Sequence, residues 1–255
     1  MSLSRISLIA FLVVSFLSGC EQQSESGKQW QADEVLLHMA ELRKEVAALR
    51  NEVKSLKNDI ANVKAVAGPS KIKSLPLAGQ ASLGDEKASL AIIEFSDYQC
   101  PYCVRHAKQV YPELKKNFID SGKVKYFVRN FPLSFHAKAR DASIVAECAG
   151  KQGKQWPAHE FLFANSRQLG DATFDIMIKK FALNKTEFDN CRIDPVIAAK
   201  VDADIVLGQQ NGVSGTPKFF IGRIKNNMLV DAVPLSGAQY YKAFERIINA
   251  LDKKS

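Results

Sequence analysis

The stretch FSDYQCPYCVRH, residues Phe95–His106, decides how the rest of the chain is interpreted. It separates Cys100 from Cys103 by two residues, directly after the apolar run SLAIIEF. This pattern predicts a buried strand that turns into a helix, with the cysteine pair at the turn. Unpaired N–H groups and the positive end of the helix dipole stabilise a thiolate there, so Cys100 is the predicted low-pKa nucleophile. Cys103, one turn into the helix, is placed to attack a mixed disulfide on Cys100.

The segments around this stretch predict a compact α/β domain over residues 81–255. CVRHAKQVYPELKKNFIDSG predicts one helix that ends near Gly122, and KVKYFVRNF predicts a second strand. Residues from about 136 to 211 are mostly helical in pattern. PKFFIG and NMLVDAV predict a closing hairpin, and SGAQYYKAFERIINALDKK predicts a last helix.

A Cys-x-x-Cys pair can also hold zinc, which takes four ligands in a structural site. The sequence has no second such pair, and its four histidines are His38, His106, His136 and His159. Only His106 lies close to the cysteines in sequence, and we interpret it as a helix-surface residue rather than a catalytic one. We therefore expect redox chemistry, with no metal and no cofactor.

The N-terminus predicts export. The apolar run ISLIAFLVVSFL has signal-peptide length and is short for a bilayer span. It leads into LSGC, which resembles a bacterial lipobox, so we expect a signal peptide over residues 1–19 and a lipid on Cys20. By the same resemblance, Glu21 fits outer-membrane sorting in the cell envelope. A plain secretory signal with an unrelated cysteine is the alternative. Either form of export places the chain in an oxidising compartment.

A polar tether over residues 20–34 precedes a heptad pattern over residues 35–67. Apolar residues occupy the two core positions of each heptad: Met39, Val46, Val53 and Ile60 at a, and Val35, Leu42, Leu49, Leu56 and Val63 at d. Acidic residues at g and basic residues at e match for a parallel coiled coil. A single amphipathic helix would show a wider apolar stripe. We therefore predict a parallel homo-oligomeric stalk, a dimer with a trimer as the alternative, and then a linker over residues 68–80.

The distribution of charge bears on the class of partner. The net charge is +8, but the basic residues are scattered, so we expect no nucleic-acid partner.

Five cysteines are present, and removing Cys20 leaves four, which allow three pairings. The simplest partition joins Cys100 with Cys103 and Cys148 with Cys191.

Three separated blocks resemble the DsbA-like oxidoreductases of the thioredoxin-fold family. They are LAIIEFSDYQCPYC, RNFPLSFHAKARDASIVAECAGKQGKQWPAHEFLFAN and NGVSGTPKFFIG. The resemblance runs from about residue 83 to the C-terminus. It implies a thioredoxin fold with an inserted helical domain.

The resemblance also implies roles for individual residues. Pro217 would be a cis proline facing the cysteines, and the Thr216 backbone would bind the client chain in an edge-strand manner. Glu94 would be a buried acid that relays the proton of Cys103. Pro101 and Tyr102 would tune the redox poise.

Some members of the family carry a second, structural disulfide in the inserted helices. Together with export, this indicates a Cys148–Cys191 disulfide. Two separate buried thiols are the alternative.

The resemblance leaves the direction of the redox chemistry open. Tyr102 replaces the histidine of DsbA, Thr216 resembles the isomerase-type members, and an N-terminal oligomerisation segment is also typical of isomerases. We therefore expect an isomerase or reductase of exported proteins with cysteines, served by a membrane redox partner. A DsbA-type oxidase is one alternative. An envelope tether or scaffold with a vestigial redox domain is another.

Overall fold

The structure is a computed structural model that describes residues 34–57 and 72–253. The chain divides between residues 68 and 69 into two units. In the first unit, residues 34–57 are helical, and all of them are exposed in the single chain. The predicted stalk is thus a helix as far as residue 57. The predicted signal peptide, Cys20, the tether up to residue 33 and the last ten residues of the stalk lie outside the described residues.

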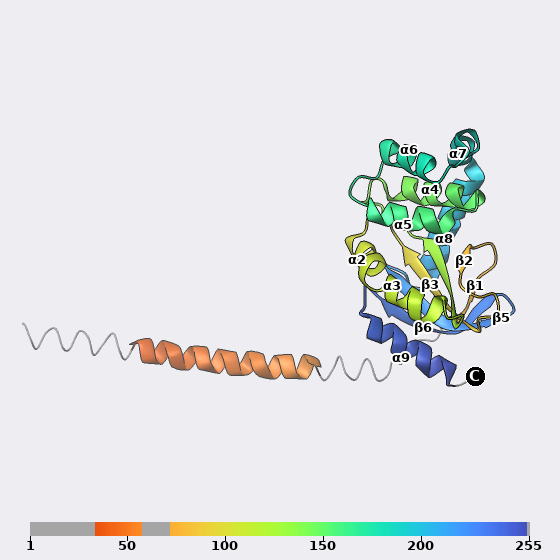
Figure 1. Ribbon diagram of the computed structural model, residues 1–255. Coiled ribbons are helices and arrows are strands. Elements are labelled where there is room, and N and C mark those ends of the chain that lie inside the picture. The colour runs from red at the N-terminus through yellow and green to blue at the C-terminus, as the bar shows by residue number, and fades with distance from the viewer. Residues whose placement is uncertain (1–33, 58–71, 254–255) are drawn as a thin grey trace, which may run out of the picture. The chain divides into compact units, whose positions relative to one another are not determined.

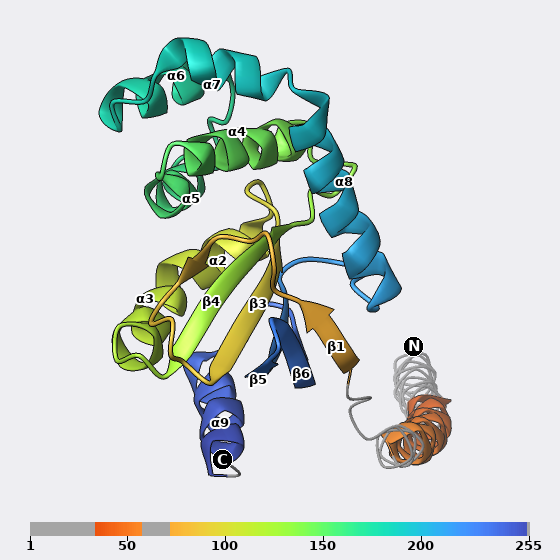
Figure 2. The same ribbon diagram turned by 90° about the vertical axis from the view of Figure 1, so that its right-hand side faces the viewer.

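The second unit is built on a six-stranded sheet with the strand order β1-β6-β5-β3-β4-β2 (Figures 1 and 2). The strands are β1 (Ile72–Pro76), β2 (Ser82–Leu83), β3 (Leu90–Ser96), β4 (Val124–Asn130), β5 (Lys218–Lys225) and β6 (Met228–Ser236). The central strand β3 runs parallel to β4 and antiparallel to β5. All seven of its residues are buried, as the apolar run predicted. The expected closing hairpin is β5–β6.

Helices cover both faces of the sheet and one of its ends. They are α2 (Pro101–Gln109), α3 (Tyr111–Leu114), the π-helical turn η1 (Lys115–Ile119), α4 (Ala139–Lys151), α5 (Gln155–Ala164), α6 (Asp171–Lys180), α7 (Lys185–Arg192), α8 (Pro195–Gln210) and α9 (Tyr241–Asp252). One apolar core joins α3, η1 and α9 to one face of the sheet, and another includes side chains of α8 on the opposite face. Figure 2 shows α4–α7 stacked beyond the end of the sheet where α2 begins. The α/β class and the helical insertion are therefore confirmed.

Two local expectations differ from the structure. The single helix expected to end near Gly122 is broken after Gln109, because Pro112 has no N–H and its ring clashes with the preceding turn of a continuous helix. Residues 72–76, expected to be linker, form the edge strand β1, in which Ser74 pairs with Val230 of β6. A sheet edge tolerates the proline that ends this strand, and so the proline did not exclude a strand.

A buried ion pair ties the helical insertion to the sheet beside the predicted site. Arg129 Nη1 on β4 lies 2.6 Å from Asp204 Oδ1 on α8, and both side chains are buried. The backbone N–H of Asn130 donates to the other oxygen of Asp204 at 3.0 Å, and Arg129 also donates to the carbonyl of Pro76. Removing one partner of such a pair typically costs about 3–5 kcal/mol. This network therefore fixes α8 against the sheet.

Candidate active site at the start of helix α2

The end of β3 and the start of α2 place the two cysteines. Cys100 is the N-cap residue of α2 and Pro101 is its first residue, where a missing N–H costs nothing. Cys103 follows one turn later and is fully buried. Both cysteines are free thiols and belong to the apolar core of the helical insertion. The site thus lies between the thioredoxin-like sheet and the inserted helices.

The pKa values of the two thiols are shifted in opposite directions. A hydrogen bond from the Cys103 thiol is the largest influence lowering the pKa of Cys100 to about 5, and the backbone N–H groups of Tyr102 and Cys103 act in the same direction. Burial raises the pKa of Cys103 well above its ordinary value, and the hydrogen bond to Cys100 raises it further. At neutral pH the site therefore holds a thiolate at Cys100 and a protonated thiol at Cys103.

The loop before β5 lies directly against Cys100. The Thr216–Pro217 peptide bond is cis, as the resemblance implied. When Cys100 is protonated, its thiol donates to the Thr216 carbonyl at 3.4 Å, so this backbone segment borders the reactive sulfur. The N–H of Gly237 donates to the Pro217 carbonyl at 2.8 Å and fixes the loop from the other side.

The side chain of Glu94, on the central strand β3, is almost completely buried. Burial raises the pKa of its carboxyl to about 7 against two hydrogen bonds that lower it. Tyr126 Oη donates to Oε2 at 2.5 Å, and Ser96 Oγ donates to Oε1 at 2.8 Å. A carboxyl group with this pKa can accept and return a proton near neutral pH.

His106 is buried, and its interpretation as a surface residue is wrong. The helix face that carries it packs against Phe219 and Phe244, with ring centroids 4.5 and 5.4 Å from the imidazole. Its Nε2 lies 3.1 Å from Tyr126 Oη. Burial lowers the pKa of His106 to about 3, so the ring is neutral. Because the Tyr126 hydroxyl donates to Glu94, it accepts from His106 Nε2–H.

Asp97 organises the turn between β3 and α2, a role that was not predicted from the sequence. Its Oδ1 accepts the backbone N–H groups of Gln99 at 2.7 Å and Cys100 at 3.1 Å. Its Oδ2 accepts the N–H of Leu133 at 2.8 Å and Nδ1 of His136 at 2.7 Å. An aspartate at the end of a buried strand, three residues before a helix start, is a turn-forming signal that could have identified it.

The two residues between the cysteines face outward. Pro101 is exposed, and the side chain of Tyr102 is 56% exposed. The guanidinium carbon of Arg105 lies 5.2 Å from the Tyr102 ring centroid, and Arg105 also donates to the Ala238 carbonyl at 3.1 Å. Tyr102 is therefore held at the exposed rim of the site.

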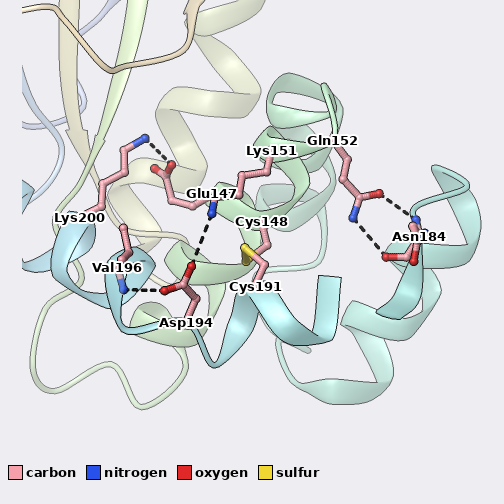
Figure 3. Close-up of a disulfide and its surroundings, with 9 residues drawn as sticks. All are labelled: Glu147, Cys148, Lys151, Gln152, Asn184, Cys191, Asp194, Val196 and Lys200. Atoms are coloured by element: carbon pink, nitrogen blue, oxygen red, sulfur yellow. Dashed lines mark hydrogen bonds and ion pairs between the residues drawn. A yellow bond between two sulfur atoms is a disulfide. The ribbon is translucent and has the colours of Figure 1, made fainter. Parts of the chain in front are cut away.

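The structure joins the other cysteine pair, Cys148 on α4 and Cys191 on α7, in a disulfide with a Cα–Cα distance of 5.7 Å (Figure 3). Next to it, Gln152 and Asn184 exchange two hydrogen bonds of 3.2 and 2.8 Å. The bridge therefore fastens the end of α4 to α7.

Within residues 34–57 and 72–253, no group of three or more His, Cys, Asp or Glu side chains is placed to share a metal ion. Across the same ranges, no helix combines the length and apolar character that a membrane span requires.

A family model described as thioredoxin matches residues 77–250. The chain belongs to the thioredoxin family. It is 30% identical over 170 residues to disulfide bond formation protein D of Bacillus subtilis, covering 62% of this chain and 72% of that protein. It is also 29% identical over 156 residues to the Na(+)/H(+) antiporter NhaA 3 of Salinispora tropica, covering 61% of this chain. The match spans only 23% of the antiporter's length.

Solved structures show the same relationship. Alpha-DsbA1 of Wolbachia pipientis superposes with a TM-score of 0.62 at 26% identity, covering 71% of this chain and 94% of that one. Oxidised BdbD of Bacillus subtilis gives a TM-score of 0.58 at 26% identity, covering 72% and 98%. The catalytic domain of Proteus mirabilis ScsC, at 22% identity and a TM-score of 0.56, shares the fold. These matches confirm the expected resemblance to DsbA-like proteins.

Proposed function

We propose that this chain is an envelope thiol–disulfide oxidoreductase that isomerises or reduces disulfides in exported proteins. The observation that carries the proposal is the opposite shift of the two thiol pKa values. The pKa of Cys100 is lowered and that of Cys103 is raised. A thiolate is the attacking species in thiol–disulfide exchange, and a neighbouring thiol resolves the mixed disulfide. No cofactor enters this chemistry.

The reaction begins when the Cys100 thiolate attacks one sulfur of a client disulfide. A mixed disulfide forms, and the other client sulfur leaves as a thiolate. In isomerisation, a client thiolate then attacks elsewhere and finally displaces Cys100. In reduction, Cys103 loses its proton toward Glu94 and attacks the Cys100 sulfur. The client leaves reduced by two electrons, and the enzyme is left oxidised. The Thr216 backbone would hold the client strand beside Cys100.

Three features favour isomerisation or reduction over oxidation. Tyr102 stands where DsbA has a histidine, Thr216 precedes the cis proline, and the N-terminal helix exposes an apolar stripe. Leu42 and Leu49 of that stripe are 58% and 59% exposed in the single chain. Pairing this face with a second copy would bury it and bring two redox sites to one client.

A second candidate function is disulfide formation. A relative of this chain carries the name disulfide bond formation protein D. A stabilised Cys100 thiolate also favours the reduced enzyme, which makes the disulfide form a better oxidant. In that case a membrane redox partner would reoxidise Cys100 and Cys103 after each turnover.

The envelope location is also a proposal. We infer that Cys20 carries a lipid that anchors the mature chain to the outer membrane, and that the coiled coil holds the redox domains off the membrane. Cys20→Ala should release a soluble periplasmic form. An unmodified N-terminus in mass spectrometry of the purified protein would contradict the anchor.

The activity is tested by comparing the full chain with Cys100→Ala. Insulin reduction should be measurable for the former and absent for the latter, and equal rates would favour a scaffold with a vestigial redox domain. Reactivation of scrambled ribonuclease in a glutathione-free buffer separates the candidates. An isomerase reactivates it in the reduced form, whereas an oxidase instead oxidises a reduced client stoichiometrically.

A further inference from the structure

We propose that Asp97 and His136 are paired positioning residues of the redox site, an inference that rests on the proposed oxidoreductase function. Asp97 holds the backbone of the turn that presents Cys100. His136 supplies the positive charge that keeps this carboxylate from opposing a thiolate at Cys100. The side chain of Asp97 is completely buried, and that of His136 is 19% exposed.

The carboxylate of Asp97 is shared between the active-site turn and the loop that leads into the inserted helices. Its Oδ1 accepts the N–H groups of Gln99 at 2.7 Å and Cys100 at 3.1 Å. Its Oδ2 accepts the N–H of Leu133 at 2.8 Å and lies 2.7 Å from His136 Nδ1. Cys100 is the N-cap residue of α2. A hydrogen bond to its N–H therefore fixes the residue from which the reactive sulfur projects.

A buried carboxylate beside the nucleophile has an electrostatic disadvantage. A like charge within about 4–6 Å disfavours the charged form of a group, and Asp97 Oδ1 is bound to the backbone of Cys100 itself. An uncompensated charge on Asp97 would therefore favour the Cys100 thiol over the thiolate, and the thiolate is the nucleophile. Among the residues that the structure describes, no lysine or arginine pairs with Asp97, and His136 is the one side chain that donates to it.

His136 can supply the compensating charge in the pH range where Cys100 ionises. An ordinary imidazole is protonated below about pH 6.5. In that form Nδ1 donates to Asp97 Oδ2 at 2.7 Å, a length typical of a charge-assisted hydrogen bond. The ring also packs edge-on against Phe135, with 4.6 Å between the two ring centroids. His136 is thus held against the carboxylate that holds Cys100.

The test titrates the Cys100 thiolate by its ultraviolet absorbance in the reduced full-length chain, with the same titration of Cys100→Ser subtracted. His136→Asn keeps an N–H donor near the Nδ1 position but carries no charge. We expect it to raise the pKa of Cys100 from about 5 to about 6, which lowers the alkylation rate at pH 5 about fivefold. Asp97→Asn/His136→Asn removes both charges and leaves an oxygen for the N–H groups of the turn. The pKa of Cys100 should then return to within about 0.3 of the wild-type value.

A control variant and a second measurement separate charge compensation from general damage. Lys200→Gln is the matched control, because it removes the cationic partner, 2.6 Å away, of another buried carboxylate, Glu147. It should leave the pKa of Cys100 unchanged. His136→Asn should also lower the redox potential of the cysteine pair, because a less stable thiolate makes the disulfide form a weaker oxidant.

Three results would overturn the pairing of Asp97 with His136. They are an unchanged pKa of Cys100 and an unchanged potential in His136→Asn, a raised pKa that persists in the double variant, and an equal rise in Lys200→Gln. A wild-type chain in which Cys100 titrates at the ordinary value of about 8.5 would instead refute the proposed thiolate chemistry, and the pairing with it.

Discussion

Replacing Glu94 by glutamine should make the fold more stable at alkaline pH than at acidic pH, relative to wild type. The pKa of Glu94 rises from 4.5 to about 7 because burial penalises the carboxylate. The difference is roughly 2.5 pH units, and each corresponds to about 1.4 kcal/mol, so ionising this group in the folded state costs about 3 kcal/mol. The wild-type fold keeps its full stability below pH 4.5 and loses this contribution as the pH rises through 7.

Glutamine removes the titration but also changes the hydrogen bonds. Its single carbonyl oxygen can accept from Tyr126 or from Ser96, and its NH₂ group meets the other. That mismatch costs about 1–3 kcal/mol at every pH. The pH dependence of the difference between the two proteins, rather than its absolute value, therefore reports on the buried charge.

The assay is urea unfolding of both proteins between pH 4 and pH 8.5. Cys100→Ser/Cys103→Ser is used as the common background, so that no thiol of the site titrates. The unfolding free energy of the Glu94→Gln protein, minus that of its parent, should increase by about 3 kcal/mol across this range. A difference that is constant to within about 1 kcal/mol would refute the raised pKa and the proton-accepting role that depends on it.

Three further predictions concern the cysteines and the stalk. Alkylation of the reduced chain should modify Cys100 with an apparent pKa of about 5 and spare Cys103; earlier labelling of Cys103 in a peptide map would reverse the assignment. Replacing Cys148 and Cys191 by alanine should lower the unfolding free energy by about 4 kcal/mol, since the bridge spans 43 residues. A loss below about 1 kcal/mol in urea unfolding is incompatible with that constraint. Deleting residues 35–67 should give a monomer in light scattering that still reduces insulin but no longer reactivates scrambled ribonuclease. Full isomerase activity in the deletion variant would refute the proposed role of the stalk.

Much of the fold could be predicted because its signals are local. The apolar run before Cys100, the hairpin after Pro217 and the helical pattern between them each carry their own periodicity. The edge strand β1 could not be predicted in this way, because its pairing partner lies more than 150 residues away in β6. A proline within that short segment also argued for a linker.

Site residues could be predicted where the residue type and its place in a motif indicate the chemistry. They could not be predicted where their role depends on tertiary contacts. Cys100, Cys103 and Glu94 follow from their places in the motif and its resemblance. His106 was misplaced because a histidine that follows Arg105 and is two residues before Lys108 gives no sign that Phe219 and Phe244 cover it. The bond from Tyr126 to Glu94 joins two strands and has no signature in either segment.

The equilibrium redox potential of Cys100 and Cys103 against glutathione tests the central claim most directly. The pKa of Cys100 is lowered to about 5. This lies between the values of about 7 for thioredoxin and about 3.5 for DsbA. The corresponding potentials are about −270 and −120 mV. The account predicts a single two-electron transition between these limits, lost in Cys100→Ala. No transition, or a potential below about −270 mV, would contradict it.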